Sequence, residues 1–554
     1  MDKYSIGIDF GTLSARALLI NIATGKEIAS CVYEYPHKVI ETELPNGKKL
    51  TGSWALQDPQ DYLDTMRAVL KGVLKKSKVN NNDIVGVGID FTSCTMLPVD
   101  KNNTPLSSLP QYKSEPHAYA KLWKHNSAQK PSELIDETAK KGGYDLLNLY
   151  GGKTNSEWML PKIMQIADEA PQIYNECDRI VEAGDWIVWK LTGQRVRSTC
   201  MAGFKSFWNY KKGYPENDFF TKLNPNFSNL IDEKLAGPLK NVGECAGKVT
   251  AEMAEFTGLK EGTPVATAAI DAHASLPACG ISEPGQLLMI IGTSTCHILL
   301  GKDEKEIPGI CGVVKDGILP GYFAYEAGQN CVGDSFAWFI KNCLPDSYTQ
   351  DAKSKNQNIY KYLQEKAEKL HPGESGLVAL DWFNGVRSTL MNYNLSGLML
   401  GMTLQTKPEE IYRALIEATA FGARKIMETY ENGGVPIKEI FAAGGIASKD
   451  SMTMQIYADI CNRDIYVTQS SQSSAFGSAM YGIYAAGSEK TGYNSMEEIV
   501  QLGKTKKTCY HPIPENVKIY NVLYNEYKKL YENFGIKSSD TMAALKALKE
   551  SWQV

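Results

Sequence analysis

Apolar residues gather near the N-terminus in two short runs that a small polar segment separates. The runs cover residues 4–9 and 15–21, and Gly11, Thr12 and Ser14 lie between them. Glycine adopts a positive φ without strain, and a hydroxyl group can satisfy the free amides of a tight turn. The pattern therefore predicts a β-hairpin with a Gly-Thr turn at its tip.

The same pattern returns in the middle of the chain, where residues 290–300 read IIGTSTCHILL. Four positions recur in register: Gly11, Thr12, Leu18 and Leu19 correspond to Gly292, Thr293, Leu299 and Leu300. One such turn is usually only a hairpin, but its recurrence at matching positions argues against coincidence. The turn presents backbone N–H groups and small hydroxyls to one point, which suits phosphate oxygens. The repeat thus predicts two related domains that face each other across a nucleotide.

Two long segments predict amphipathic helices. Residues 58–76 and 407–432 carry apolar side chains near a 3.6-residue period. Residues 439–468 read as strand, glycine-rich turn, helix and strand, which is typical of a βαβ unit. A further charged helix is expected over residues 517–534. Residues 110–126 are polar and aromatic without a clear period, and we expect a surface loop followed by a short helix there.

Two predicted strands end in an acidic residue. Residues 84–89 are continuously apolar and are followed by Asp90. Residues 263–270 are small and apolar and are followed by Asp271. Short apolar runs of this kind are consistent with buried strands of a parallel sheet.

The length of the chain bounds the number of domains. With 554 residues it is too long for one ordinary hydrophobic core. We expect two large lobes, residues 1–278 and 279–535, and a helical C-terminal tail, residues 536–554. The crossover between the lobes falls at about residues 277–284. No low-complexity linker lies there, so the lobes are expected to share a cleft closely.

Composition and charge exclude several classes of function. The chain has 59 Lys and Arg and 63 Asp and Glu, and its net charge of −4 gives no electrostatic case for nucleic acid or an anionic membrane. No signal segment is evident, and the apolar stretches are far shorter than the ~20 residues of a membrane span. The 12 cysteines are scattered without a C-x-x-C pair, which indicates free thiols of a reducing compartment rather than disulfides or a zinc site. We therefore expect a cytoplasmic enzyme.

Two aspartates stand where chemistry could occur. Asp9 precedes the first turn, and its carboxylate would repel a phosphate unless a cation such as Mg²⁺ lies between them, bound directly or through water. Asp271 ends an apolar strand, where an acidic side chain is costly unless it is satisfied or used. It could be the N-cap of the following helix, or a general base that accepts a hydroxyl proton during phosphoryl transfer. Asp9 could likewise cap its own turn, so the local sequence leaves both alternatives open.

A third candidate is the segment AGGIASK at residues 443–449, which opens a predicted helix. Gly444 and Gly445 would let a ligand approach the helix N-terminus, where free N–H groups favour an anion or an adenine–ribose edge. The alternative is an ordinary tight strand-to-helix turn. The segment is neither a Walker P-loop nor a G-x-G-x-x-G motif, and the chain has no nucleophile elbow or kinase catalytic loop.

These motifs together resemble the sugar kinases of the FGGY family, which belongs to the actin, Hsp70 and hexokinase superfold. The resemblance extends from about residue 4 to residue 535. The further segments that agree are WALQDP (54–59), DFTSCTM (90–96), KLWKH (121–125), AGFK (202–205), YEAGQ (325–329) and DWFNGVR (381–387). The resemblance implies an α/β fold of two ribonuclease-H-like lobes, of the actin/hexokinase type, with a central interdomain cleft.

The resemblance also implies roles for individual residues. Asp271 matches the catalytic base that takes a proton from the terminal hydroxyl of the sugar, and Ser93, Lys205, Asp271 and Glu326 match the sugar-binding positions. A lysine can donate to two hydroxyls while a glutamate accepts from another, so such a site rejects sugars with misplaced hydroxyls. Without the family motif, Lys205 and Glu326 would be read as an ordinary ion pair.

The positions that match the ATP site of the family come from both lobes. They are Gly11, Thr12, Ser14, Arg16, Gly292, Thr293, Gly333, Gly444, Gly445 and Lys449. The resemblance implies that the two turns hold the β- and γ-phosphates and that the last four residues lie on the ADP side. Asp9, beside the first turn, is the expected Mg²⁺ ligand.

The activity implied by the resemblance is transfer of the γ-phosphoryl of MgATP to the C5 hydroxyl of a ketopentose. L-Ribulose is the expected acceptor, in arabinose catabolism, and D-ribulose, ribitol or xylulose are the alternatives within the family. A hypothesis from a different class is a nucleotide-switched binding protein, such as a chaperone ATPase or a filament subunit. That hypothesis leaves Ser93, Lys205 and Glu326 without a role. A homodimer is left open.

Overall fold

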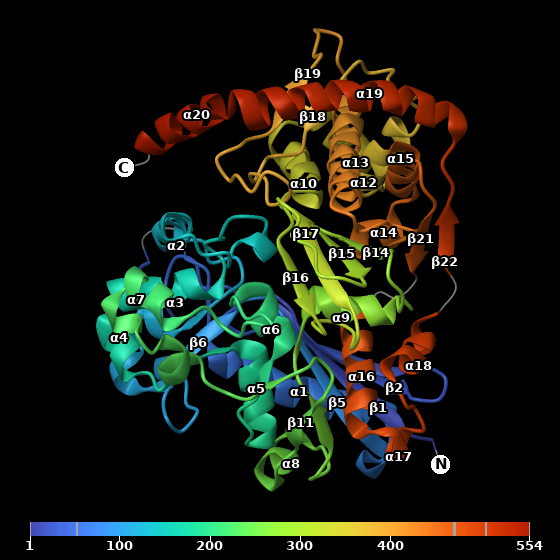
Figure 1. The fold of residues 1–554 in the computed structure, drawn as a ribbon. Coiled ribbons are helices and arrows are strands. Elements are labelled where there is room, and N and C mark those ends of the chain that lie inside the picture. The colour runs from blue at the N-terminus through green and yellow to red at the C-terminus, as the bar shows by residue number, and fades with distance from the viewer. Residues whose placement is uncertain (1, 51–53, 469–471, 505–506, 553–554) are drawn as a thin grey trace.

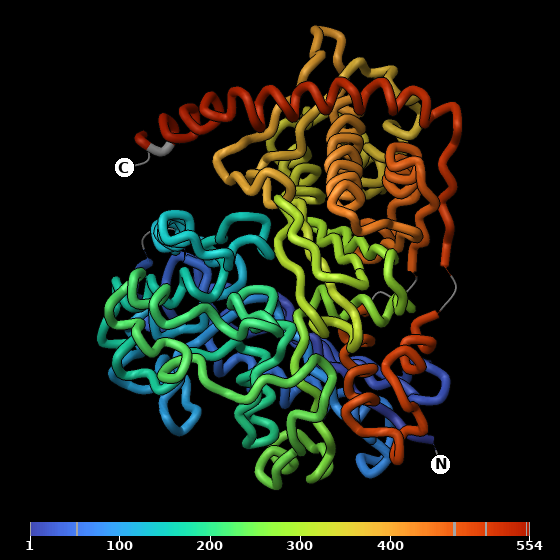
Figure 2. The backbone as a smooth tube through the Cα atoms, viewed as in Figure 1, coloured from blue at the N-terminus to red at the C-terminus, as the bar shows by residue number. Residues whose placement is uncertain are grey.

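The structure is a computed structural model that describes residues 2–50, 54–468, 472–504 and 507–552. The chain forms two stacked lobes (Figure 1), with the N-terminal half in the lower lobe and most of residues 286–468 in the upper one. The backbone trace passes between the lobes more than once (Figure 2). This arrangement confirms the expected two-lobe α/β fold.

The lower lobe is built on a sheet with the strand order β11-β12-β5-β1-β2-β3. Its strands are β1 (Tyr4–Phe10), β2 (Ser14–Asn21), β3 (Glu27–Glu34), β5 (Ile84–Phe91), β11 (Cys245–Lys248) and β12 (Pro264–Ala266), with β13 (Ala269–Ile270) paired to β5. β1, β2 and β3 are antiparallel neighbours, whereas β5 runs parallel to β1 and β12 parallel to β5. β5 is buried over its whole length, as its apolar run predicted, and it continues through Asp90. The single strand expected over residues 263–270 is two short strands.

The upper lobe repeats this topology. Its sheet has the order β16-β17-β15-β14-β20-β21-β22. The strands are β14 (Gln286–Ile291), β15 (Thr295–Gly301), β16 (Gly312–Lys315), β17 (Phe323–Gln329), β20 (Glu439–Ala443), β21 (Ile465–Thr468) and β22 (Lys507–Tyr510). β14, β15 and β17 are antiparallel, and β20 and β21 add on in parallel, so their order mirrors β1, β2, β3, β5 and β12. The duplicated motif is therefore the first hairpin of two related sheets.

The two hairpin turns differ by one residue. In the first, Gly11 donates its N–H to the Ser14 carbonyl at 3.0 Å, and in the second, Gly292 donates to the Ser294 carbonyl at 2.9 Å. When the two sequence repeats are aligned, the residue pairs across β14 and β15 are therefore shifted by one position from those across β1 and β2. Because side chains alternate between the faces of a sheet, the aligned residues of one strand point to opposite faces in the two lobes.

One helix far along the chain belongs to the lower lobe. After β21 the chain returns to the first sheet as α16 (Ser473–Ala486), α17 (Ser488–Thr491) and α18 (Met496–Val500), then rejoins the upper sheet as β22. α16 packs on β1, β5 and α9 (Asp271–Ala278). The approach is close, since a Cβ at Gly88 would lie 1.7 Å from the Ser478 carbonyl oxygen. The division at residues 278 and 279 stays a prediction, and it did not anticipate this return.

A smaller subdomain extends the lower lobe, on the left of Figure 1. A four-stranded sheet of β4 (Leu56–Gln57), β6 (Met96–Val99), β7 (Ala120–Lys121) and β8 (Arg179–Glu182) carries α2 (Gln129–Gly142), α3 (Met159–Glu169), α4 (Pro171–Glu176) and α7 (Asn217–Leu223). The expected surface loop holds for residues 110–115, which are exposed or half-buried, but it is wrong for residues 116–122, which are buried, and 3₁₀ turns and β7 replace the expected short helix. The fully buried Lys121 is accommodated there, with its Nζ 4.6 Å from the centre of the Trp54 ring.

The other predicted helices are present. α1 (Pro59–Ser77) and α13 (Pro408–Asn432) match the two long periodic segments, and α14 (Gly445–Lys449) and α15 (Ser451–Cys461) follow β20. α19 (Pro514–Glu532) crosses the top of the upper lobe and is followed by α20 (Ser539–Ser551), which projects from it (Figure 1). The remaining α-helices and strands are α5 (Ala183–Thr192), α6 (Thr199–Lys205), α8 (Ala251–Thr257), α10 (Gly333–Asn342), α11 (Asp346–Ser354), α12 (Ile359–Ala367), β9 (Arg197–Ser198), β10 (Leu239–Lys240), β18 (Val378–Leu380) and β19 (Leu398–Leu400).

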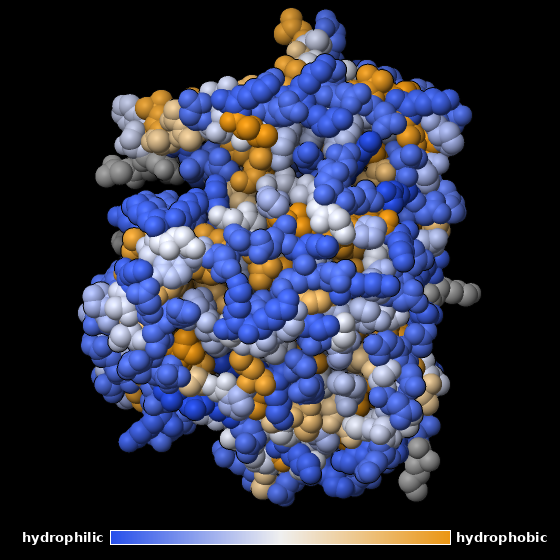
Figure 3. Space-filling view, viewed as in Figure 1, coloured by the Kyte–Doolittle hydropathy of each residue, from blue (hydrophilic) through white to orange (hydrophobic). Residues whose placement is uncertain are grey.

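The surface visible in Figure 3 is mainly polar, and the cysteines form no disulfides. The face shown in Figure 3 is mainly hydrophilic, with apolar side chains in small separate groups. Among the described residues, no helix is long and apolar enough to cross a bilayer. All 12 cysteines are free thiols.

Candidate functional site

Three carboxylates meet at one edge of the lower sheet. Asp9 and Asp90 lie opposite each other on the parallel strands β1 and β5, and Asp271 follows β13, whose Ala269 lies opposite Asp90. Parallel strands bring their carboxyl ends to the same edge of a sheet, which is where α/β proteins bind ligands. Sequence analysis did not assign a role to Asp90, although an aspartate inside a fully buried strand was a usable signal.

Burial and mutual repulsion dominate the electrostatics of this edge. Burial and the negative charge of Asp9 raise the pKa of Asp90 well above its ordinary 3.8. Burial also raises the pKa of Asp9, while a hydrogen bond with Asp90 and the charge of Arg16, 4.0 Å away, act in the opposite direction. Ser478 of α16 donates to Asp90 Oδ2 at 2.6 Å, and Asp90 Oδ1 is buried without a hydrogen-bond partner.

The donor set fits a hard divalent cation held partly through water. It consists of carboxylate oxygens, and the excess negative charge is only partly offset by Arg16. Within the described part of the chain, the oxygen atoms of these three carboxylates do not all lie within 4.8 Å of one another. Water between the cation and at least one carboxylate would therefore complete the coordination.

Asp271 is the first residue of α9 and a candidate base. Its Oδ1 accepts the N–H of the next residue, Ala272, at 2.7 Å, but Ile270 holds the N-cap position, so the capping alternative is wrong. Burial first, and then the negative charges of Asp9 and Glu326, raise its pKa to about 7. A base whose pKa lies near 7 is half ionised at neutral pH, which suits acceptance of a hydroxyl proton. Asp9 of β1 and Glu326 of β17 both act on it electrostatically, but Asp271 is not among the residues that line the cavity described next.

Ser93, Lys205 and Glu326 line one cavity. Lys205 Nζ donates to Glu326 Oε1 at 2.5 Å, and Glu326 Oε2 lies 2.9 Å from His273 Nε2. Ser93 Oγ is buried without a partner. Three of the four sequence-predicted sugar residues are thus brought together by α6, β17 and the loop after β5, with one hydroxyl and one ion pair at the cavity, whereas Asp271 does not line it.

The ion pair in the cavity is held in its charged form. Burial alone would raise the pKa of Glu326, but Lys205 and His273 hold it well below its usual range. Burial would lower the pKa of Lys205, and Glu326 outweighs this effect and raises it. His273 is fully buried, and burial lowers its pKa although Glu326 acts in the opposite direction.

Several cavity residues were not predicted. They are Cys94, Trp123, Asn155, Glu157, Trp158, Cys311, Arg387, Met391 and Tyr393. Trp123 also donates its indole N–H to Thr12 Oγ1 at 3.0 Å, which joins the cavity to the first turn. Arg387 pairs with Glu157 at 3.3 Å. Trp123 and Arg387 lie in two of the family segments, and that was the signal available in the sequence.

The predicted ATP residues of the upper lobe also converge. Gly333 begins α10 and donates its N–H to the Gly292 carbonyl at 3.0 Å, and Val332 donates to the Thr293 carbonyl at 2.8 Å. Gly444 has φ +98°, and a Cβ there would lie 2.4 Å from the Ile291 carbonyl oxygen. Gly445 faces open space, and Lys449 ends α14 with an exposed side chain. In the lower lobe, Gly11, Thr12, Ser14 and Arg16 are partly exposed at the first turn.

Two glycine-rich turns, a carboxylate cluster and a polar cavity between two duplicated lobes define a phosphotransferase of the sugar-kinase class. Two family models match the chain, the N-terminal domain of the FGGY family of carbohydrate kinases at residues 4–277 and its C-terminal domain at residues 287–486. The chain therefore belongs to the FGGY family of carbohydrate kinases.

Curated relatives match along almost the whole chain. A ribulokinase from Bacillus licheniformis is 54% identical over 97% of this chain and 98% of its own length. A ribulokinase from Halalkalibacterium halodurans is 50% identical over 99% of this chain and 98% of its own length. Identity at this level over both lobes supports a carbohydrate kinase.

Solved structures show the same fold at low identity. A xylulose kinase from Lactobacillus acidophilus superposes with a TM-score of 0.79 at 18% identity, covering 97% of this chain and 100% of that one. A xylulose kinase from Rhodospirillum rubrum gives 0.77 at 21% identity, covering 96% and 99%. At this identity the likeness establishes the fold alone, and it confirms the expected actin/hexokinase-type architecture.

Proposed function

We propose that the protein is a ribulokinase, which transfers the γ-phosphoryl group of ATP to the C5 hydroxyl of L-ribulose. The observation that carries the proposal is the Lys205–Glu326 pair, which lines a cavity with Ser93, while the charge of Glu326 also acts on Asp271. Relatives named ribulokinase, 54% and 50% identical over nearly the full chain, support this acceptor.

The cavity residues can hold a polyol by complementary hydrogen bonds. The Lys205 ammonium donates to sugar oxygens, the Glu326 carboxylate accepts from a hydroxyl, and Ser93 Oγ can do either. A sugar with a hydroxyl in the wrong place would leave one of these buried groups unpaired, which costs affinity and turnover.

Asp271 then acts on the hydroxyl that becomes the nucleophile. Its carboxylate accepts the hydroxyl proton as the oxygen attacks the γ-phosphorus, and the bond between that phosphorus and the β-phosphate oxygen of ADP breaks. The N–H groups and hydroxyls of the two turns are proposed to hold the phosphate oxygens. Closure of the lobes would exclude water, which otherwise competes as the acceptor.

Mg²⁺ is the proposed cation at the carboxylate edge. Asp9 and Asp90 would hold it, at least partly through water, because Mg²⁺ prefers carboxylate oxygens as ligands. Burial raises the pKa of both groups, so their ionised forms are unfavourable without a cation. When bound, the ion neutralises charge on the phosphate oxygens during transfer.

The first experiment is ADP release from MgATP with L-ribulose, D-ribulose, ribitol and xylulose and with no sugar. We expect strong stimulation by L-ribulose. Stimulation by another sugar alone would keep the kinase and replace the acceptor. Sugar-independent ATP turnover would instead favour a nucleotide-switched binding protein.

The variant Asp271→Asn tests the base. Turnover should fall by about 10²–10⁴-fold, because the amide cannot accept the proton. ATP affinity, measured by calorimetry on the same sample, should be unchanged. An Asp271→Asn enzyme with near wild-type kcat would contradict the assignment.

A further inference from the structure

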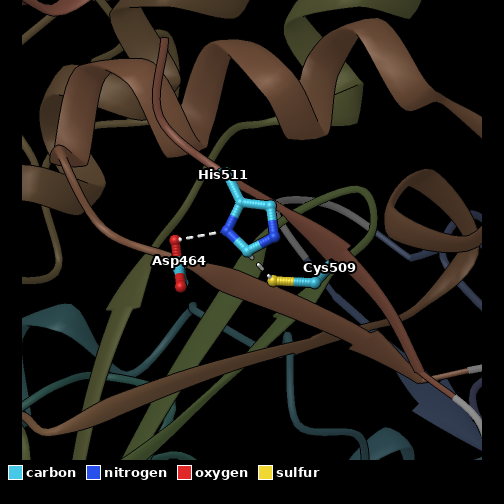
Figure 4. Close-up of side chains that lie close together, drawn as sticks. All are labelled: Asp464, Cys509 and His511. Carbon is cyan, nitrogen blue, oxygen red and sulfur yellow. Dashed lines mark hydrogen bonds and ion pairs between the residues drawn. The ribbon is translucent and has the colours of Figure 1, made fainter. Parts of the chain in front are cut away.

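Three side chains with metal-binding atoms meet on the outer edge of the upper sheet, far along the chain from the sugar cavity. Figure 4 shows Asp464, Cys509 and His511 turned toward one another. Cys509 and His511 are two residues apart on or just beyond β22, so they lie on the same face of the strand. β21 and β22 pair with Ile465 opposite Tyr510, which places Asp464 opposite His511.

The spacing of these atoms approaches that of a metal site. His511 Nδ1 lies 2.9 Å from Asp464 Oδ1 and 3.8 Å from Cys509 Sγ. Tetrahedral zinc with the usual Zn–N and Zn–S lengths needs ligand atoms roughly 3.3–3.5 Å apart. Within the described part of the chain, this is the group in which three such ligand atoms lie within 4.8 Å of one another.

The chemistry of the three donors selects a class of ion. Thiolate and imidazole ligands favour zinc and its first-row neighbours, whereas Mg²⁺ prefers oxygen alone. The side chains of His511 and Asp464 are 71% and 45% exposed, so an ion in solution can reach them. Tyr466 lies opposite Cys509 in the strand pairing.

We propose that Asp464, Cys509 and His511 bind one divalent transition-metal ion of the zinc class, separate from the Mg²⁺ of the reaction. The ion takes the place of the proton between His511 Nδ1 and Asp464, which moves through solvent to His511 Nε2, and it displaces the thiol proton of Cys509 to solvent. Three protein ligands leave a fourth tetrahedral position for water.

The position of the site indicates what the ion would do. β21 precedes the return of the chain to the lower lobe, and β22 follows it. An ion bound to Asp464, Cys509 and His511 would join the strands at both ends of that return and close a long loop. Cross-links of this kind stabilise the folded state, and a ligand that binds only the folded protein raises Tm.

The test is a titration of the chelator-treated full-length protein with Co²⁺, without a nucleotide or sugar. We expect a thiolate-to-Co²⁺ charge-transfer band that saturates at one equivalent and is removed by Zn²⁺. The band should be absent in Cys509→Ser, and Co²⁺ affinity in His511→Ala should fall by about 10–100-fold. Cys343→Ser is the matched control, because Cys343 is an exposed free thiol elsewhere on the protein.

Thermal unfolding gives a second, independent measurement. Zn²⁺ should raise the Tm of the wild type and of Cys343→Ser and leave that of Cys509→Ser unchanged. A charge-transfer band that persists in Cys509→Ser, or a wild type that shows no band with Co²⁺ in excess, would overturn the proposal.

Discussion

Asp271 combines a fixed orientation with a raised pKa. Its carboxylate accepts the Ala272 N–H, and burial and the charges of Asp9 and Glu326 raise its pKa to about 7. The hydrogen bond orients the carboxylate while its surroundings keep it basic. At the residue scale, the N-cap alternative is wrong, because Ile270 holds that position of α9, and the role of general base stays a prediction.

The pKa of Asp271 predicts the pH dependence of the reaction. Only the ionised carboxylate accepts a proton, so with a pKa of about 7 the active fraction rises roughly tenfold between pH 6 and pH 8. The kcat/KM for the sugar, measured at low sugar and saturating MgATP, should follow this rise with a slope of one below the pKa. A flat profile down to pH 5.5 would show that another group accepts the proton.

The same shift predicts an effect on stability. A carboxyl whose pKa is higher in the folded than in the unfolded state favours the folded state at low pH, and this contribution is lost as pH rises from about 4 to about 7. Asp271→Asn does not lose this stability as pH rises. The Tm of the variant minus the Tm of the wild type should therefore increase by a few degrees between about pH 4 and about pH 7 and stay constant at higher pH. Calorimetry without nucleotide measures this, and an advantage that shrinks with rising pH would contradict it.

The Lys205–Glu326 pair predicts a contrast between stability and activity. Lys205→Met leaves the Glu326 carboxylate buried with His273 alone, which should cost about 3–5 kcal/mol of unfolding free energy. Adding Glu326→Gln removes the charge and should restore much of the stability while sugar-dependent turnover stays lost. Urea unfolding and ADP release on the two single variants and the double variant complete the cycle. Equal stability of Lys205→Met and the wild type would show that the pair is not structurally important.

At the scale of elements, the strand-turn-helix unit at β20 and α14 depends on one glycine. Gly444 adopts φ +98°, and a Cβ there would lie 2.4 Å from the Ile291 carbonyl oxygen of β14. Gly444→Ala should lower the unfolding free energy by about 1–3 kcal/mol, because it strains the backbone and pushes β14 from β20. It should also weaken ATP binding.

Gly445 is the matched control for that variant. It is the next residue, and a Cβ there meets nothing within 4 Å. Gly445→Ala should therefore change the urea midpoint of the nucleotide-free protein very little. Equal midpoints for the two variants would contradict the role given to the turn.

Elements with a regular period were predictable, and one without a period was not. Both hairpins and the helices α1 and α13 follow from local patterns of apolar residues. Within residues 110–126, the residues 116–122 and His125 were wrongly expected on the surface, because polar side chains such as Lys121 suggested solvent. They are buried because partners such as the Trp54 ring and Gln165 come from distant segments.

At the scale of the whole molecule, α16 ties the end of the chain to its beginning. It covers β1 and β5 at glycines of the first sheet and supplies Ser478 to Asp90. The lower lobe therefore needs residues from both halves of the sequence to close its core and its carboxylate edge.

This dependence can be tested with fragments of the lower lobe. Residues 1–280 alone should lack a cooperative thermal transition, because the face of β1 and β5 that α16 covers would be exposed. The same residues joined by a flexible linker to residues 472–503 should unfold cooperatively by circular dichroism. Residues 1–280 joined to α19 are the control, and cooperative unfolding of residues 1–280 alone would contradict the prediction.

The sequence by itself determined the duplicated turns, the two-lobe fold, the family and the residues that match its motifs. These features are local, because a turn or a periodic helix is specified by a few neighbouring residues. The sites given to those residues stay predictions, although Ser93, Lys205 and Glu326 do line one cavity.

Only the tertiary structure decided which distant side chains meet. Asp90 joins Asp9 because two strands run in parallel register, Trp123 donates to Thr12 from a segment 111 residues away, and Asp464 meets Cys509 and His511 through strand pairing. None of these pairs has a spacing that the sequence reveals. Strand register and helix packing depend on the free energy of burying the whole core. That free energy depends on residues from the entire chain, so no short segment of the sequence determines it.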